Sequence, residues 1–237
     1  MGRLRWAFCL ERWALKSPAA VLVFVIAAGA VAVAQIVPVS QEPHHRVVFE
    51  NASLRVLDVD IPPGTTTLDH RHDHDLLIVS VGAADTRIRT PGSDWGPVRP
   101  RRVLGETSVT EYVGQPGVHA IQNVGVDPYR LIAVENARER GWSALPPVAP
   151  TGAEVLADGR AFRATLVRVR GGDAAVARVH AVPSVLVLVS GEAVISRGGH
   201  AVALGPVARW TVVGAGESFT VASTGAGESQ LVAVEVR

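Results

Sequence analysis

Apolar residues in this chain occur in short runs from residue 46 onward, and glycine, proline and aspartate separate the runs. Within residues 54–61, Leu-Arg-Val-Leu-Asp-Val-Asp-Ile, apolar and polar positions alternate loosely, as in a strand with one face in water. Similar runs rich in Val, Ile and Leu cover residues 46–50, 76–81, 129–134, 163–170, 185–189, 192–196 and 231–236. Short strands between turn residues predict an all-β fold of sandwiches or small barrels.

Part of this pattern occurs twice along the chain. Residues 113–125 resemble residues 213–225 at a constant offset of 100 positions. Residues 76–82 likewise resemble residues 185–191, and the two matches come in the same order. Repetition of this kind indicates a duplicated structural unit.

The boundary between the two units falls in a proline-rich stretch. Three prolines lie between residues 146 and 150, where the strand pattern stops. Such a stretch is typical of a linker. We therefore expect one β domain at residues 46–138, a linker at residues 139–151 and a second β domain at residues 152–237.

The first 34 residues have the features of a targeting segment. A basic region precedes residues 18–34, which carry no charge and end in Ala-Val-Ala. In one interpretation residues 1–34 are a signal peptide cleaved before Gln35, and the protein is periplasmic or secreted. In the other, residues 18–34 remain as a membrane anchor, because about 17 apolar residues is the lower limit for a span. Both interpretations export the remainder of the chain, and only the second makes the membrane a partner.

Composition removes several classes of function. Hydrophobic residues make up 48% of the 237 residues and the formal charge is +1, so neither a disordered chain nor a strongly basic nucleic-acid binder is expected. The single cysteine, Cys9, and the single lysine, Lys16, both lie in the targeting segment. A disulfide, a thiol nucleophile, thiolate-bound zinc and Schiff-base chemistry are therefore excluded for the rest of the chain. Phosphate-binding loops and the serine-hydrolase elbow are also absent.

Histidines carry the candidate chemistry. His70, His72 and His74 occupy alternate positions. Alternate side chains of a strand share a face, so His70 and His72 can point at one metal ion. His74 has the same phase and could join them if the strand runs straight. A further ligand must come from elsewhere, and His119 follows a glycine-rich turn. Neutral imidazole is a common ligand of Zn, Fe, Cu and Ni.

These residues resemble the two sequence motifs of the cupin family. The first motif, in family terms, is Gly, five residues, His-x-His, a short gap, Glu, six residues and Gly. Gly64, His70 and His72 match it in place, and Asp75 stands where the family has glutamate, six residues before Gly82. The second motif ends with His, three residues and Asn, which His119 and Asn123 match.

The resemblance implies an antiparallel β-barrel, or jelly roll, that encloses a metal ion, and the whole chain resembles a bicupin. His70, His72, Asp75 and His119 are the implied metal ligands. Asp75 is one methylene shorter than the family glutamate and closer to His72. Two roles therefore remain open for it, a direct ligand or a residue that orients a ligating histidine.

The second half lacks most of this set. The constant offset places Phe219 where His119 stands, and only His180 lies near the position of the first motif. One imidazole with no carboxylate binds a first-row ion poorly. We therefore expect a degenerate second cupin without metal, in which His180 is a surface residue or a hydrogen-bonded structural one. His200, and the adjacent His44 and His45, are expected to be solvated.

The expected cofactor is one divalent first-row transition metal ion, with Fe, Mn, Zn, Ni and Cu all open. Iron would indicate a dioxygenase, whereas Mn or Zn would suit isomerisation, decarboxylation or hydrolysis. The alternatives are a module that binds a small ligand or a metal without chemistry, and a structural or storage protein. Tyr112 and Glu111 are candidates for an acidic group or tyrosine that faces the metal, which would favour an enzyme. Arg101 or Arg102 is a candidate contact for an anionic substrate.

The expected partner is thus a small-molecule substrate or ligand, with no nucleic acid, and a homodimer is one compatible assembly.

Overall fold

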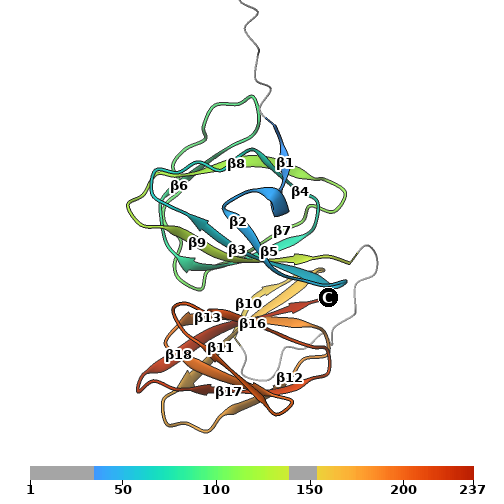
Figure 1. Cartoon of the computed structure of the whole chain (residues 1–237), viewed down its shortest axis with the longest axis vertical. Coiled ribbons are helices and arrows are strands. Elements are labelled where there is room, and N and C mark those ends of the chain that lie inside the picture. The colour runs from blue at the N-terminus through green and yellow to red at the C-terminus, as the bar shows by residue number, and fades with distance from the viewer. Residues whose placement is uncertain (1–34, 139–153) are drawn as a thin grey trace, which may run out of the picture. The chain divides into compact units, whose positions relative to one another are not determined.

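The computed structural model describes residues 35–138 and 154–237, which form two β-barrels (Figure 1). The predicted all-β fold of two tandem barrels is confirmed. The predicted targeting segment and the predicted linker both lie outside the described residues. Within the described ranges, no helix is long and apolar enough to cross a membrane.

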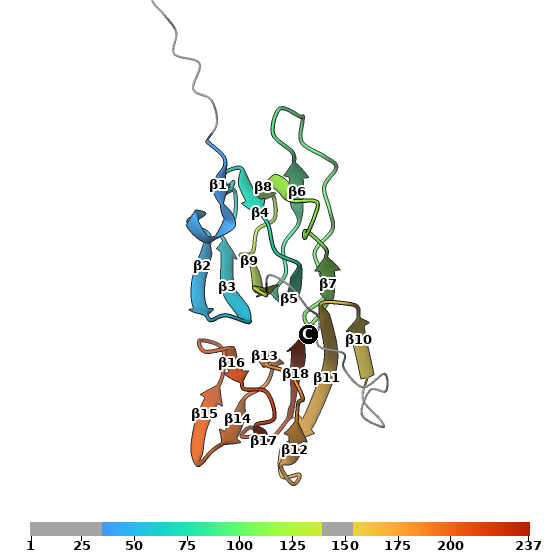
Figure 2. The same ribbon diagram turned by 90° about the vertical axis from the view of Figure 1, so that its right-hand side faces the viewer.

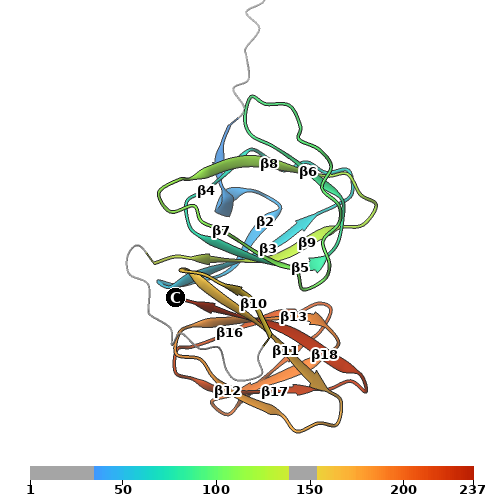
Figure 3. The ribbon, with the colours of Figure 1, turned by 180° about the vertical axis from the view of Figure 1, so that it is seen from behind.

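The first barrel consists of a five-stranded and a four-stranded sheet that face each other (Figures 1 and 3). The five-stranded sheet has the order β2 (His45–Glu50), β3 (Leu54–Ile61), β9 (Tyr129–Asn136), β5 (Leu76–Gly82) and β7 (Thr107–Thr110). The four-stranded sheet has the order β1 (Val37–Pro38), β4 (His70–His72), β8 (Gly117–Asn123) and β6 (Thr86–Arg89).

A short N-terminal segment belongs to this barrel. Its strand β1 pairs in parallel with β4, and Val37 is the register partner of His70. The 3-10 helix η1 (Val39–Gln41) follows and leads into β2 (Figure 2). This segment therefore brings residues that precede the predicted domain start at residue 46 into the first barrel.

The second barrel repeats the arrangement. Its five-stranded sheet has the order β10 (Glu154–Asp158), β11 (Phe162–Arg170), β18 (Glu228–Val236), β13 (Ser184–Ser190) and β16 (Trp210–Val213). Its four-stranded sheet has the order β12 (Val176–Val179), β17 (Ser218–Ser223), β14 (Ala193–Arg197) and β15 (His200–Leu204). Strands β12, β17 and β14 thus correspond to β4, β8 and β6 of the first barrel.

Alternation along the strands builds the cores. In β3, Leu57, Val59 and Ile61 are buried inside the first barrel, where they pack with residues of β5, β8 and β9. The interior of the second barrel holds a larger set of apolar side chains, including Phe219. A third cluster combines buried residues of the two five-stranded sheets, such as Leu54 and Phe162. Burial of apolar surface of this kind is the main stabilising contribution to such a fold.

Candidate metal centre

Three of the predicted ligands meet inside the first barrel. Strand β4 pairs with β8 so that His70 is the register partner of His119, and His72 follows on the same face of β4. The ring centroid of His70 lies 4.6 Å from that of His119 and 5.1 Å from that of His72. The ring centroids of His72 and His119 lie 5.1 Å apart. One nitrogen from each ring lies within 4.8 Å of the others. His70, His72 and His119 therefore form a group that could hold one metal ion.

Residues of the two motifs fix the strands that carry this group. Gly64 has φ +74°, a left-handed conformation that favours glycine, and its N–H donates to the carbonyl of Asn123. The Asn123 side chain donates to the carbonyls of Ile61 and Asp127, both at 2.8 Å. A Cβ at Gly82 would lie 2.9 Å from the Cβ of Arg130, so this position has no room for a side chain. Gly64, Gly82 and Asn123 are thus structural residues of the site.

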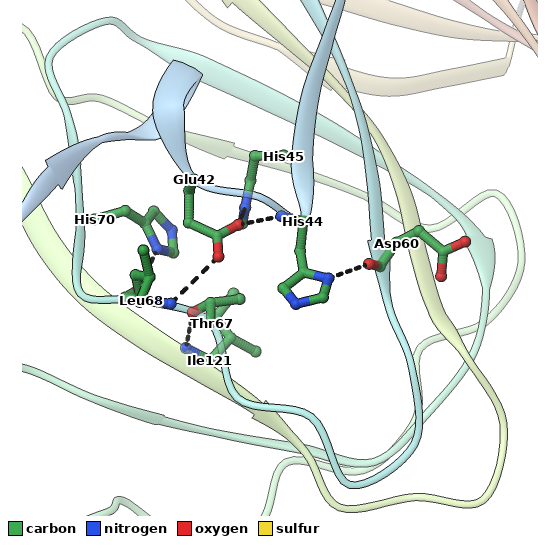
Figure 4. Close-up of polar contacts among 8 residues, drawn as sticks. All are labelled: Glu42, His44, His45, Asp60, Thr67, Leu68, His70 and Ile121. Atoms are coloured by element: carbon green, nitrogen blue, oxygen red, sulfur yellow. Dashed lines mark hydrogen bonds and ion pairs between the residues drawn. The ribbon is translucent and has the colours of Figure 1, made fainter.

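The protonation state of His70 suits metal binding. Its Nδ1 donates to the carbonyl of Leu68 at 2.9 Å, as Figure 4 shows, and this leaves Nε2 as the free nitrogen. That Nε2 is buried and has no hydrogen-bond partner. Burial, and then the neighbouring imidazoles of His45 and His119, lower the pKa of His70 to about 2. A buried neutral imidazole with an unpartnered nitrogen is the form in which histidine binds a metal ion.

His119 has the same character. Burial lowers its pKa to about 3, and the charges of His72, His45 and Arg99 act in the same direction. The donor set is three imidazoles, which suits Fe, Mn, Zn, Ni or Cu and leaves coordination positions for other groups. On these observations the residues present fit the predicted ion.

A buried carboxylate that the sequence patterns did not indicate lies behind His72. Oε1 of Glu135 is 3.8 Å from Nδ1 of His72, and both atoms are buried without a hydrogen-bond partner. The other carboxylate oxygen of Glu135 accepts a hydrogen bond from Arg55 at 2.8 Å. Glu135 therefore faces the outer nitrogen of His72, the place from which a carboxylate orients a metal-binding imidazole.

Asp75 has a different set of contacts. Its side chain is fully buried, and Oδ1 accepts hydrogen bonds from the backbone N–H groups of Tyr112 at 2.8 Å and Val113 at 2.9 Å. Oδ2 lies 3.9 Å from Arg160. The group of three imidazoles does not include this carboxylate. Direct coordination of the metal by Asp75 stays a prediction. Its hydrogen bonds to Tyr112 and Val113 connect it to the loop between β7 and β8.

The structure also places the other candidates from the sequence. Strand β4 ends at His72, so His74 lies beyond the strand and outside the group. Tyr112 stacks on His72 with ring centroids 5.0 Å apart and lines the adjacent pocket. Burial raises the pKa of Tyr112. Glu111 is exposed, and its carboxylate lies 3.8 Å from Arg160. Of the two candidates Tyr112 and Glu111, only Tyr112 lines the pocket.

The expectation that His45 is solvated was wrong. Its side chain is only 5% exposed, and its ring centroid lies 4.5 Å from that of His70. The reason is the pairing of β1 with β4, which carries the following residues into the barrel. Burial lowers the pKa of His45, although the adjacent carboxylate of Glu42 acts in the opposite direction. Adjacent His44 is half-buried and bonds the carbonyl of Asp60, whereas His200 is exposed as expected.

A pocket of about 370 Å³ opens next to the three imidazoles. Its wall includes His72 and His119, apolar side chains of β3, β5 and β9, and three arginines. Two of these arginines have carboxylate partners, since Arg101 lies 3.4 Å from Asp127 and Arg102 lies 2.6 Å from Glu106. Among the described residues, the Arg99 side chain has no such partner. The free cation of the pocket is thus Arg99, whereas the sequence had indicated Arg101 or Arg102.

The described residues of the second barrel, 154–237, contain no equivalent group. Phe219 of β17 pairs with Arg178 of β12, as His119 pairs with His70, so Phe219 occupies the place of His119. Phe219 is 2% exposed and belongs to the apolar core. His180 is buried and its Nδ1 lies 2.7 Å from the hydroxyl of Ser184. His180 is therefore the hydrogen-bonded structural residue of the two predicted options.

Comparison with known proteins identifies the fold. No family model matches the sequence, and no curated protein matches it. Solved structures do match. One is a cupin 2 conserved barrel domain protein from Leptotrichia buccalis, which is 9% identical to this chain and has a TM-score of 0.51. The alignment covers 81% of this chain and 88% of that chain. The protein has the cupin fold. Its two barrels make it a bicupin.

Two further solved structures match most of this chain. AerE from Microcystis aeruginosa is 10% identical with a TM-score of 0.59, over 83% of this chain and 98% of that chain. Salicylate 1,2-dioxygenase from Pseudaminobacter salicylatoxidans is 12% identical with a TM-score of 0.58, over 82% of this chain and 77% of that chain. At these identities the similarity establishes the fold.

Proposed function

We propose that the protein is a metal-dependent cupin enzyme of the oxygenase class, with its active site in the first barrel. The observation that carries the proposal is the buried Nε2 of His70, which has no hydrogen-bond partner and lies within a group of three imidazoles. Unpartnered polar atoms are rare in protein interiors unless they serve a ligand. A dioxygenase among the structural neighbours supports the same reaction class.

Different residues of the chain have different roles in the proposed site. His70, His72 and His119 hold the ion, Glu135 orients His72, and the apolar wall of the pocket excludes water from the bound molecule. The bound ion would supply Lewis acidity and, if it is iron, reactivity towards dioxygen.

The pocket favours a small organic anion as substrate. Its size suits a molecule of one ring or a short chain, and its apolar walls suit an apolar body. Arg99 lines the same pocket without a carboxylate partner, and its charge is close enough to His119 to lower that pKa. A guanidinium in this position can bind a substrate carboxylate. A carboxylate bound to Arg99 would bring the rest of the molecule close to the imidazoles.

Metal analysis followed by oxygen uptake tests the proposal. The purified protein should contain one ion per chain and consume oxygen with at least one member of a panel of aromatic and short-chain carboxylates. The variant Arg99→Met should raise KM for that substrate and leave the metal content unchanged, because it removes only the anion contact. A protein that binds none of the divalent ions of Fe, Mn, Zn, Ni and Cu would contradict the proposal.

We further propose that residues 1–34 direct export to the periplasm or beyond the cell. The support is the basic region followed by an uncharged apolar run and Ala-Val-Ala. N-terminal sequencing of the native protein should find Gln35 as the first residue. An intact chain in the membrane fraction would support an anchor instead, and an intact chain in the cytoplasm would contradict both.

A further inference from the structure

A fourth histidine lies at the site without belonging to the metal group. His45 lines the same pocket as His72 and His119, and its ring centroid lies 4.5 Å from that of His70 and 6.3 Å from that of His72. The three-imidazole group does not include it. His45 is thus a buried imidazole beside the candidate metal centre with no role in the function proposed above.

A buried carboxylate sets the orientation of this ring. Glu42, three residues earlier, has its side chain fully buried, and its Oε2 lies 2.6 Å from Nδ1 of His45 (Figure 4). Backbone N–H groups hold the carboxylate in place, since His44 donates to Oε2 at 2.8 Å and Leu68 donates to Oε1 at 3.2 Å. Three nitrogen atoms therefore fix Glu42 as an acceptor between the η1 segment and the loop that leads into β4.

This arrangement decides which nitrogen of His45 carries the proton. An ionised carboxylate can only accept hydrogen bonds, so Nδ1 of His45 carries a hydrogen and donates it to Glu42. In the neutral ring the remaining nitrogen, Nε2, then has a lone pair and can only accept. The side chain that presents this lone pair lines the pocket.

We propose that His45, positioned by Glu42, is a specificity-determining residue that accepts a hydrogen bond from a hydroxyl group of the substrate. The inference rests on the proposed function, which places the substrate in this pocket. Arg99 and His45 both line the pocket, and together they select a small carboxylate that also carries a hydroxyl group. A site built to bond a hydroxyl rejects the analogue that lacks it, because a buried polar group is then left without a partner.

Binding of matched ligands tests the inference without turnover. The probes are benzoate, the three hydroxybenzoates and the three methoxybenzoates, measured by calorimetry on the full-length protein of known metal content and again after chelation of the metal. At least one hydroxybenzoate should bind about tenfold or more tightly than its methoxy analogue and than benzoate. His45→Leu should remove this preference without weakening benzoate binding, because no polar group is then left without a partner, and should keep one ion per chain.

Two further variants keep the test independent of folding defects. His45→Gln retains an acceptor oxygen and should restore part of the preference. Glu42→Gln should weaken the preference while His45 remains, because a carboxamide can also donate and no longer fixes the proton on Nδ1. Thermal unfolding of each variant confirms that it is folded before binding is measured.

The outcomes separate this inference from the proposed function. Absence of bound metal in the wild-type protein would contradict the proposed function, while a preference for the hydroxyl that depends on His45 in the chelated protein would still support the role of His45. Equal binding of hydroxy and methoxy probes by the wild type would overturn the inference. Loss of the metal ion in His45→Leu would also overturn it, because His45 would then be a ligand.

Discussion

Replacement of Asp75 by Asn separates the two roles that the sequence left open for this residue. The exchange removes the charge and nearly preserves the shape. In the structure, Oδ1 of the fully buried carboxylate accepts two backbone N–H bonds, at 2.8 and 2.9 Å, from Tyr112 and Val113. A carboxamide oxygen can still accept both bonds, but each becomes a bond between neutral groups.

The magnitude follows from those two bonds. Hydrogen bonds to charged groups contribute about 1.5–3 kcal/mol each and neutral ones about 0.5–1.5 kcal/mol, so Asp75→Asn should lower the free energy of unfolding by about 2 kcal/mol. Because the three imidazoles remain, metal affinity should fall by no more than about tenfold, through small shifts of Tyr112 against His72. Asp75→Glu should also destabilise the fold, since a further methylene at a fully buried position forces the neighbouring groups to shift.

Urea unfolding of the metal-free protein and calorimetric titration with Zn²⁺ measure the two quantities. Asp73→Asn is the matched control, because Asp73 is exposed and, within the part of the chain that the structure describes, pairs with exposed Arg71 alone, at 2.6 Å. The control should change neither quantity by much. A loss of metal affinity well beyond about 100-fold in Asp75→Asn, with unchanged free energy of unfolding, would refute this reasoning and identify Asp75 as a direct ligand.

Three further predictions concern buried groups of the two barrels. Glu135→Gln should weaken metal binding by about 10–100-fold, because the carboxylate no longer orients His72; unchanged affinity would exclude that role. Burial lowers the pKa of His180 to about 4, so its contribution to stability, about 3 kcal/mol at most, is present near pH 7 and is lost as the pH falls from about 6.5 to 4. His180→Asn should therefore lose less stability between pH 7 and pH 4.5 in urea unfolding, and parallel curves would contradict the assignment. Phe219→Ala should cost about 3–5 kcal/mol without changing metal content, and a cost below about 1 kcal/mol would mean that Phe219 does not fill the core.

The sequence predicted the parts of the fold that local patterns encode. Alternation along residues 54–61 follows from strand geometry, and the structure has β3 at those residues. The spacing of Gly64, His70 and His72 predicted a strand that presents two imidazoles on one face, and the second motif supplied His119. The repeat likewise placed Phe219 at the position equivalent to His119, and the strand registers of the two barrels agree with that placement.

Contacts between distant segments account for what the sequence did not predict. Glu42 precedes β2 and His45 is its first residue, and the pairings of Val37 with His70 and of His45 with Val59 bring them to the site. A Glu-x-x-His spacing was the one available signal, and it is common in solvated turns. Glu135 is one polar residue at the end of an apolar strand, and its proximity to His72 depends on the pairing of β5 with β9. Among the described residues, Arg99 lacks the carboxylate partner that Arg101 and Arg102 have. This difference depends on how the loops fold, so the sequence does not reveal it.

The central claim is that the protein holds one metal ion, in the first barrel, through three imidazoles. Elemental analysis of the wild type and of His119→Ala and His200→Ala, after loading with a divalent ion and gel filtration, tests it most directly. His200 is exposed in the second barrel and serves as the control. The account predicts one ion per chain in the wild type and in His200→Ala, and none in His119→Ala, because two imidazoles bind weakly. Two ions per chain, or full retention by His119→Ala, would contradict it.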